Sequence, residues 1–198
     1  SLATERKAAH WLSGPGSDAP DRRAIADAYD AIVAAAGLFA LHTEHRYALN
    51  FEAPGDLLAA YQKELHRLDR LYRRFCTHAE PALRQGWDLL KTLADQVERV
   101  YDKGFLQPLG LEWSRLLDNG FLGTWSLDAF PAQQDFYARD IRPHLAESER
   151  KRAFVIISDA FRYEAATELT ESLNGIYRMN AELSTMLGVL PSYTALGM

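Results

Sequence analysis

A short apolar run late in the chain, Ala153-Phe154-Val155-Ile156-Ile157, constrains the fold more than any other stretch. The run is rich in β-branched and aromatic residues and shows no alternation of apolar and polar side chains. A run of this kind is typical of a strand that is buried on both faces of a parallel sheet. It ends in Ser158-Asp159, so polar side chains stand where the strand should end. We therefore predict that an α/β segment begins at about residue 149.

The residues after this strand complete a predicted β-α-β unit. Apolar side chains fall on one face of a helix from Tyr163 to Leu173. Asn174-Gly175 should end that helix, because both residue types tolerate a left-handed backbone. A second strand is expected within Ile176 to Leu187, most clearly from Leu183 to Leu187. The C-terminal part should thus hold about two strands at the start of a parallel sheet.

Two polar residues stand at the expected carboxyl edge of this sheet, where ligands bind in such units: Asp159 and Thr194. An Asp carboxylate held there can coordinate a divalent metal, and a metal-activated Thr hydroxyl can attack phosphorus. Backbone N–H groups of a helix starting near Thr194 would hold phosphate oxygens, which makes Ser192 and Ala195 candidate phosphate-binding positions. On spacing alone, helix capping by Asp159 and by Ser192 or Thr194 is the favoured interpretation, because caps are far commoner than metal sites.

Two separated motifs resemble the paired signature of the PglZ family. The first is Ile157-Ser158-Asp159-Ala160-Phe161-Arg162-Tyr163-Glu164, and the second is Leu190-Pro191-Ser192-Tyr193-Thr194-Ala195-Leu196-Gly197-Met198. That family belongs to the alkaline phosphatase superfamily and accompanies bacteriophage-exclusion (BREX) and related phage-growth-limitation systems. The resemblance implies that Asp159 is the first metal ligand, that Thr194 is the metal-bound nucleophile, and that Arg162 supports the site.

Phosphodiesterase relatives have a similar pattern, in which an Asp-Gly-x-Arg segment precedes a Pro-Thr-x-Thr loop. In this chain Ala160 replaces the Gly and Ser192 replaces the first Thr, which suits the PglZ family better.

The resemblance also implies two divalent metal ions, commonly zinc, held mostly by Asp and His residues downstream of the nucleophile. The sequence stops four residues after Thr194, and all six histidines precede the predicted strand: His10, His42, His45, His66, His78 and His144. His42-x-x-His45 is interpreted as a solvated pair, because no further ligand spacing supports it. We therefore expect a fragment with an incomplete metal site and no turnover of its own.

Residues 1–148 are predicted to form an all-α region, so that the chain is mainly helical overall. A helix is expected from Asp21 to Ala40. Helical seams from Asp56 to Cys76 and from Pro81 to Tyr101 predict an antiparallel hairpin over 56–103, with Pro81 in the first turn of its second helix and Gly104 beyond the end. Shorter helices are expected over 111–117 and 133–141, the latter ended or kinked near Pro143.

The composition is that of an ordinary folded protein, for which nucleic acid is a possible partner that the charge does not indicate. The net charge of −5 implies no broad attraction to nucleic acid. One helix face carries four basic residues and is interpreted as solvated rather than as a contact for phosphate: Lys63, Arg67, Arg70 and Arg74.

The single cysteine, Cys76, is interpreted as a packing residue and suits a reducing cytoplasm. No signal peptide and no apolar run near the roughly 20 residues of a membrane span are seen, so a cytoplasmic location is expected.

The preferred hypothesis is a fragment of a metal-dependent phosphohydrolase of an anti-phage system, with the nucleophile Thr194 acting on phosphate esters. The resemblance implies defence-system partners, including a methyltransferase and an ATPase. One alternative is a non-catalytic scaffold of the defence complex, whose helical region docks other proteins. A further alternative is a phosphodiesterase or nuclease.

Overall fold

The computed structural model describes residues 2–8, 20–45, 49–84, 88–147 and 152–193. These residues are mainly helical, as predicted. The chain divides into two compact units, of which the first comprises residues 1–52 and 56–116 and the second residues 53–55 and 117–198. Each unit is described by itself.

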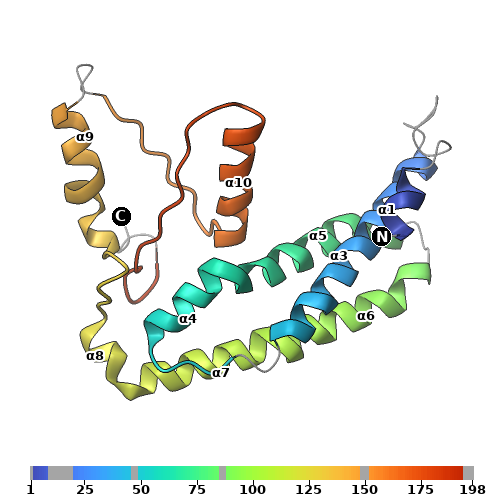
Figure 1. Ribbon diagram of the computed structural model, residues 1–198, viewed down its shortest axis with the longest axis horizontal. Coiled ribbons are helices and arrows are strands. Elements are labelled where there is room, and N and C mark those ends of the chain that lie inside the picture. The colour runs from blue at the N-terminus through green and yellow to red at the C-terminus, as the bar shows by residue number, and fades with distance from the viewer. Residues whose placement is uncertain (1, 9–19, 46–48, 85–87, 148–151, 194–198) are drawn as a thin grey trace. The chain divides into compact units, whose positions relative to one another are not determined.

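The first unit is built on the long helix α3 (Pro20–His45), which packs along α5 (His66–Arg84), while α1 (Leu2–Lys7) packs against α3 (Figure 1). The buried side chains of α3 are mostly small: Ala24, Ala28, Ala31, Ala34 and Ala35, followed by Leu38 and Leu41. Small side chains allow two helix backbones to approach closely, and the buried Ala79 and Ala82 of α5 belong to the same core. The helix predicted over 21–40 is therefore confirmed and extends to His45.

Two long helical segments form the rest of this unit. One runs through α4 (Pro54–Ala60), a π-helical turn (Tyr61–Leu65) and α5. The other runs through a 3₁₀ turn (Asp88–Leu90), α6 (Lys91–Arg99), a second π-helical turn (Val100–Leu106) and α7 (Gln107–Leu116). The predicted pair of helices over 56–103 is thus present, with both members longer than expected.

Two of the predicted helix ends are wrong. Pro81 lies inside α5 rather than at the start of the next helix, because the buried seam continues past it through Ala82. Gly104 lies inside the second π-helical turn, where the ring of His42 occupies the space that a Cβ atom would fill. The helix consequently continues to Leu116 and includes most of the short helix predicted over 111–117.

The core of the first unit contains a buried carboxylate, Asp69, that accepts two tyrosine hydroxyls. Tyr61 donates from the first π-helical turn at 2.5 Å, and Tyr101 donates from the second at 2.6 Å. Tyr72 stacks on Tyr101 with ring centroids 3.8 Å apart and donates to Glu98 at 2.6 Å. Burial, followed by the bond to Glu98, raises the pKa of Tyr72 well above its usual value. The network thus connects the two π-helical turns through hydrogen bonds to the buried Asp69.

The second unit contains short helical pieces: a π-helical turn (Leu117–Phe121), α8 (Leu122–Thr124), a 3₁₀ turn (Gln133–Asp135), another π-helical turn (Tyr137–Ile141), α9 (Arg142–Glu147) and α10 (Tyr163–Gly175). The helix predicted from Tyr163 to Leu173 is confirmed and extends to Gly175, without the left-handed backbone expected at Asn174-Gly175. Of the stop or kink predicted near Pro143, the stop is wrong, since the helical run that begins at Gln133 continues past this residue to Glu147. Proline removes one N–H donor from this continuous helical run, directly after the π-helical turn at Tyr137–Ile141.

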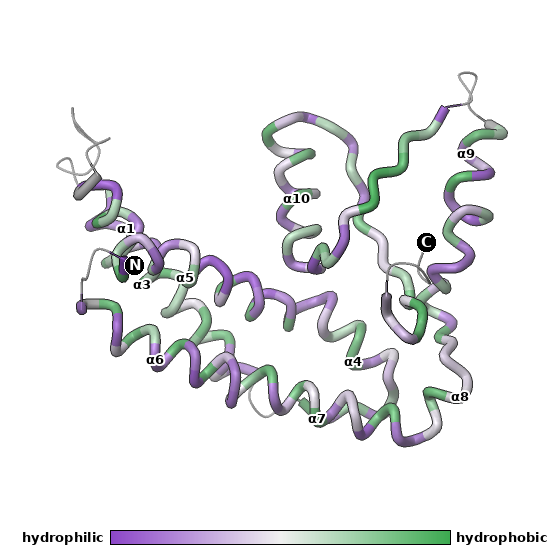
Figure 2. The backbone as a smooth tube through the Cα atoms, turned by 180° about the vertical axis from the view of Figure 1, so that it is seen from behind, coloured by the Kyte–Doolittle hydropathy of each residue, from purple (hydrophilic) through white to green (hydrophobic). Residues whose placement is uncertain are grey.

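No strand is present among the described residues, and the α/β prediction for the C-terminal part is not confirmed. Residues 153–157 are extended but unpaired, and both Phe154 and Ile156 are 92% exposed. Figure 2 shows this run as an extended apolar stretch before α10. The second predicted strand contributes only an isolated parallel bridge between Leu187 and Ala132. A buried strand requires neighbouring strands, and the described residues supply none.

Helix α3 also corrects the expectation that no apolar stretch approaches the length of a membrane span. Residues 22–45 have a mean hydropathy of 1.6 in their most apolar window, which is sufficient by length and composition. The core helix of a soluble protein passes the same test, and α3 contributes seven buried alanine and leucine side chains to the core. Its apolar character is therefore explained by packing within the first unit.

Candidate functional site

The first motif surrounds a turn between the extended run and α10. Asp159 is exposed in this turn, and Ala160 has a φ of 52°, in the left-handed region. Arg162 occupies the N-cap position of α10, where its carbonyl oxygen accepts the N–H groups of Ala165 at 3.1 Å and Ala166 at 3.0 Å. Asp159 precedes the N-cap position by three residues, so it is not the N-cap of this helix. The turn leaves the carboxylate on the surface, where it is accessible to a ligand.

Glu164, in the first turn of α10, is a residue whose burial the sequence analysis missed. It is fully buried, and both of its carboxylate oxygens are shielded from solvent. A carboxylate in the first turn of a helix is favoured by the partial positive charge of the helix N-terminus. The only sign in the sequence that Glu164 has a special environment was its place in the motif, two residues after Arg162.

The approach to the second motif is anchored to the segment that follows α8. The N–H of Leu187 donates to the carbonyl oxygen of Pro131 at 2.9 Å, and the N–H of Gln133 donates to the carbonyl oxygen of Leu187 at 2.9 Å. The indole Nε1 of Trp125 donates to the carbonyl oxygen of Gly188 at 2.7 Å. These three bonds fix the backbone just before the Leu190-Pro191-Ser192 loop.

The structure does not test whether the two motifs meet. Ser192 is exposed at the end of the anchored segment. Thr194 and Ala195 lie outside the described residues. The convergence of Asp159 with Thr194 on one phosphate therefore stays a prediction.

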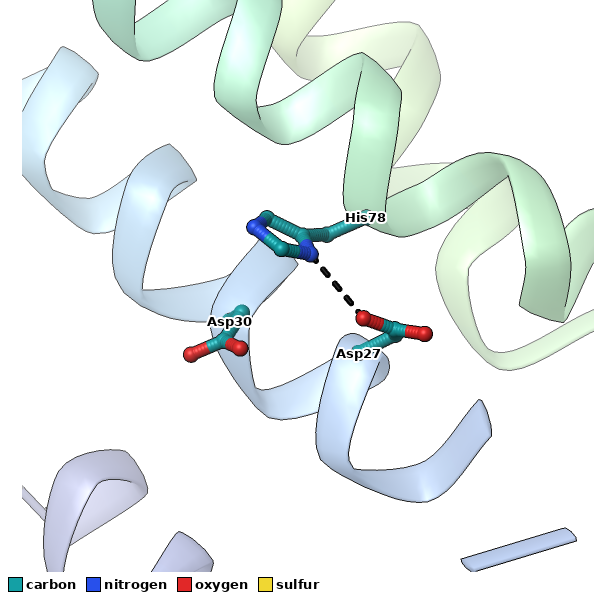
Figure 3. A group of neighbouring side chains, drawn as sticks. All are labelled: Asp27, Asp30 and His78. Atoms are coloured by element: carbon teal, nitrogen blue, oxygen red, sulfur yellow. Dashed lines mark hydrogen bonds and ion pairs between the residues drawn. The ribbon is translucent and has the colours of Figure 1, made fainter. Parts of the chain in front are cut away.

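The first unit brings together three side chains of types that can bind metals, which the sequence analysis did not connect: Asp27, Asp30 and His78. Figure 3 shows the His78 imidazole of α5 facing Asp27 of α3, with Asp30 of α3 beside them. One ligand atom from each residue lies within 4.8 Å of the other two, and His78 Nδ1 is 3.0 Å from Asp27 Oδ1. Lys7 of α1 forms an ion pair with Asp30. The i, i+3 spacing of the two aspartates was visible in the sequence, but their pairing with a histidine of another helix was not.

Two other predicted surface features differ in the structure. His42, interpreted as solvated, is half-buried and donates from Nε2 to the carbonyl oxygen of Gly104 at 3.2 Å, and Nε2 of His45 is buried. Cys76, interpreted as a packing residue, is exposed. On the basic face, Arg67 forms an ion pair with Glu64 at 2.7 Å, as suits a solvated surface.

The region that holds both motifs is similar to a known protein domain. Residues 136–198 match the profile of the BREX system PglZ alkaline phosphatase-like domain. The chain is 36% identical over 198 residues to "Alkaline phosphatase-like protein BrxZ" of Escherichia coli O9:H4 (strain HS), and 33% identical over 197 residues to "Alkaline phosphatase-like protein PglZ" of Bacillus cereus (strain H3081.97). Both matches include 100% of this chain but only 22% and 21% of the respective relatives, so the chain spans about a fifth of their length. No solved structure matches.

The C-terminal part of the chain is accordingly alkaline phosphatase-like in sequence. The resemblance that the two motifs predicted is confirmed, because the region that holds both of them is similar to the PglZ domain and the whole chain is similar to part of two PglZ-type relatives.

Proposed function

We propose that this chain is part of a metal-dependent phosphohydrolase of a BREX-type defence system, and that its catalytic residues lie in the two motifs. The observation that carries the proposal is the order of those motifs, Asp159 before Thr194, within the region that matches the PglZ domain. The exposure of Asp159 in a turn at the end of an apolar run supports its role as a metal ligand.

Each motif residue receives a specific role in this proposal. Thr194 attacks phosphorus, and the backbone around Ser192 and Ala195 holds the phosphate oxygens. Asp159 binds metal, and Arg162 supports the site. When bound, divalent metal ions, zinc by family resemblance, would lower the pKa of the Thr194 hydroxyl and neutralise charge on the phosphoryl group.

The described residues of the second unit do not complete a two-metal site. Asp159 fits the role of one ligand, because its carboxylate is exposed in the turn. Among the described residues, the one group of three candidate metal ligands lies in the first unit instead. We therefore place the remaining catalytic ligands in parts of the full-length protein that correspond to the other four-fifths of its relatives.

The test uses the full-length protein and the variants Thr194→Ala and Asp159→Ala. Hydrolysis of an aryl phosphate monoester, an aryl diester and DNA is measured with added zinc or manganese. We expect both variants to lose about a thousandfold or more of the preferred activity, because the nucleophile and a metal ligand are each indispensable. Asp128→Ala, which removes an exposed carboxylate outside both motifs, serves as the control and should keep full activity.

The same variants separate the rival functions. Full activity in both would refute the assignment of the motif residues. A preference for the diester or DNA would favour the phosphodiesterase alternative. The scaffold alternative draws support from the helical unit, whose packed core contains neither motif. It predicts that both variants keep phage resistance in cells and that the unsubstituted protein hydrolyses none of the three substrates.

A further inference from the structure

We propose that Asp27, Asp30 and His78 form a binding site for a divalent transition-metal ion, separate from the proposed catalytic centre. The site lies within the first unit, whereas both catalytic motifs belong to the second. The ligands are two carboxylate oxygens and one imidazole nitrogen. Imidazole favours zinc and its transition-metal neighbours over magnesium and calcium, so zinc is the expected ion.

The backbone around the three residues is held by close packing. Ala28 and Ala31 of α3 and Ala79 of α5 are adjacent in sequence to the ligands, and all three are buried in one core. Asp27 and Asp30 lie on the same face of α3 because they are three residues apart. The three side chains therefore start from fixed positions on two packed helices.

The distances suit a shared cation after small side-chain adjustments. Zinc–ligand bonds of about 2.0–2.2 Å place neighbouring ligand atoms about 3.4 Å apart in a tetrahedral site. The three ligand atoms lie within 4.8 Å of one another, an upper limit somewhat above this spacing. The distance of 3.0 Å between His78 Nδ1 and Asp27 Oδ1 is slightly below it. Side-chain exposures of 25% for Asp27, 29% for Asp30 and 32% for His78 leave access for water as the remaining ligand.

The structure also shows that this place attracts a cation, because the Lys7 ammonium group lies against Asp30. The ammonium group and a metal ion would compete for the same carboxylate. A metal ion bound to Nδ1 of His78 would also replace the hydrogen bond between His78 and Asp27, with the ring proton then on Nε2. The proposal thus makes two separate predictions: metal binding requires the three ligands, and the affinity for metal increases when Lys7 is removed.

The experiment measures zinc bound per chain by mass spectrometry after equilibrium dialysis, using the full chain without a polyhistidine tag. The double variant Asp27→Asn/His78→Gln should bind one zinc ion fewer than the unsubstituted protein. Asp95→Asn/His144→Gln makes the same chemical changes at exposed positions of α6 and α9 and should bind as many ions as the unsubstituted protein. Circular dichroism verifies that every variant is folded, and His78→Gln alone replaces the double variant if that variant is not.

A competition titration against a chromophoric chelator tests the role of Lys7. Lys7→Gln should bind zinc about two- to fivefold more tightly, which is the worth of one exposed ion pair. Cobalt added in place of zinc should give visible absorption bands that disappear in the double variant. Equal zinc content in the unsubstituted protein and the double variant would overturn the site. Unchanged or weaker binding by Lys7→Gln would overturn the competition between ammonium and metal.

Discussion

Glu112 connects two segments of the first unit through its carboxylate. Its Oε1 accepts the N–H of Phe51 at 2.7 Å, and Arg115 donates to both carboxylate oxygens, at 2.8 and 2.7 Å. Arg115 also donates to the carbonyl oxygen of Phe51. The bonds from Arg115, followed by the bond from Phe51, lower the pKa of Glu112 to about 2. The ionised carboxylate thus joins α7 to the segment before α4.

The lowered pKa predicts a specific loss of stability in acid. A carboxyl group whose pKa is lower in the folded chain stabilises it above the unfolded pKa of about 4.3, and this contribution disappears as the pH falls toward the folded value. We expect Glu112→Gln to lower the free energy of unfolding at pH 7, and its difference from the unsubstituted protein to shrink as the pH falls from about 4.5 to 2. Urea titrations over that range measure the difference. A difference that stays constant with pH would contradict the role of the charge.

At the level of elements, the helical segment that contains the second π-helical turn also contains two glycines, Gly104 and Gly110. Replacing each of them by alanine should change stability in opposite directions. A Cβ atom on Gly104 would lie 2.6 Å from Nε2 of His42, whereas a Cβ atom on Gly110 meets nothing within 4 Å. We expect Gly104→Ala to destabilise the first unit by about 1–3 kcal/mol, because the imidazole must move. Gly110→Ala should instead stabilise it by up to about 1 kcal/mol through helix propensity. Thermal unfolding followed by circular dichroism measures both, and a stabilising Gly104→Ala would contradict the contact.

The same glycine shows what the sequence could and could not predict about the helices. The steps of three and four residues between apolar side chains predicted both members of the hairpin, because helix packing requires that spacing. The position of Gly104 suggested a helix end, since glycine is common there. The sequence did not reveal that His42, distant in the chain, occupies the space above that glycine. Helix ends that depend on such long-range contacts could not be predicted from local pattern.

The candidate sites also differ in whether they depend on local sequence or on contacts between distant parts of the chain. The motif around Asp159 was found because its residues are contiguous, and the family comparison confirmed the resemblance. The cluster of Asp27, Asp30 and His78 was missed because it is assembled from two helices that are far apart in sequence. Likewise, the apolar run at 153–157 predicted a strand, but pairing depends on partners that the described residues do not supply.

For the molecule as a whole, the exposed apolar run predicts how the 198-residue chain behaves on its own. Phe154, Val155, Ile156 and Ile157 are all exposed and consecutive. Contiguous exposed apolar surface binds hydrophobic dyes and promotes association. We expect the chain to enhance the fluorescence of anilinonaphthalene sulfonate, and Phe154→Ser/Ile156→Ser to reduce the enhancement by about half. Leu106→Ser/Leu111→Ser, which removes two exposed apolar side chains outside the run, should reduce it much less.

The π-helical turn at Val100–Leu106 has a consequence for how relatives of this chain are aligned. Such a turn accommodates one residue more than an ordinary helical turn, and the helices on either side keep their phase. A homologue that lacks a single residue between Arg99 and Gln107 could therefore retain Val97 and Leu116 at their buried positions. A one-residue gap placed here in an alignment would mark a wide turn that became an ordinary one, rather than a break in the helix.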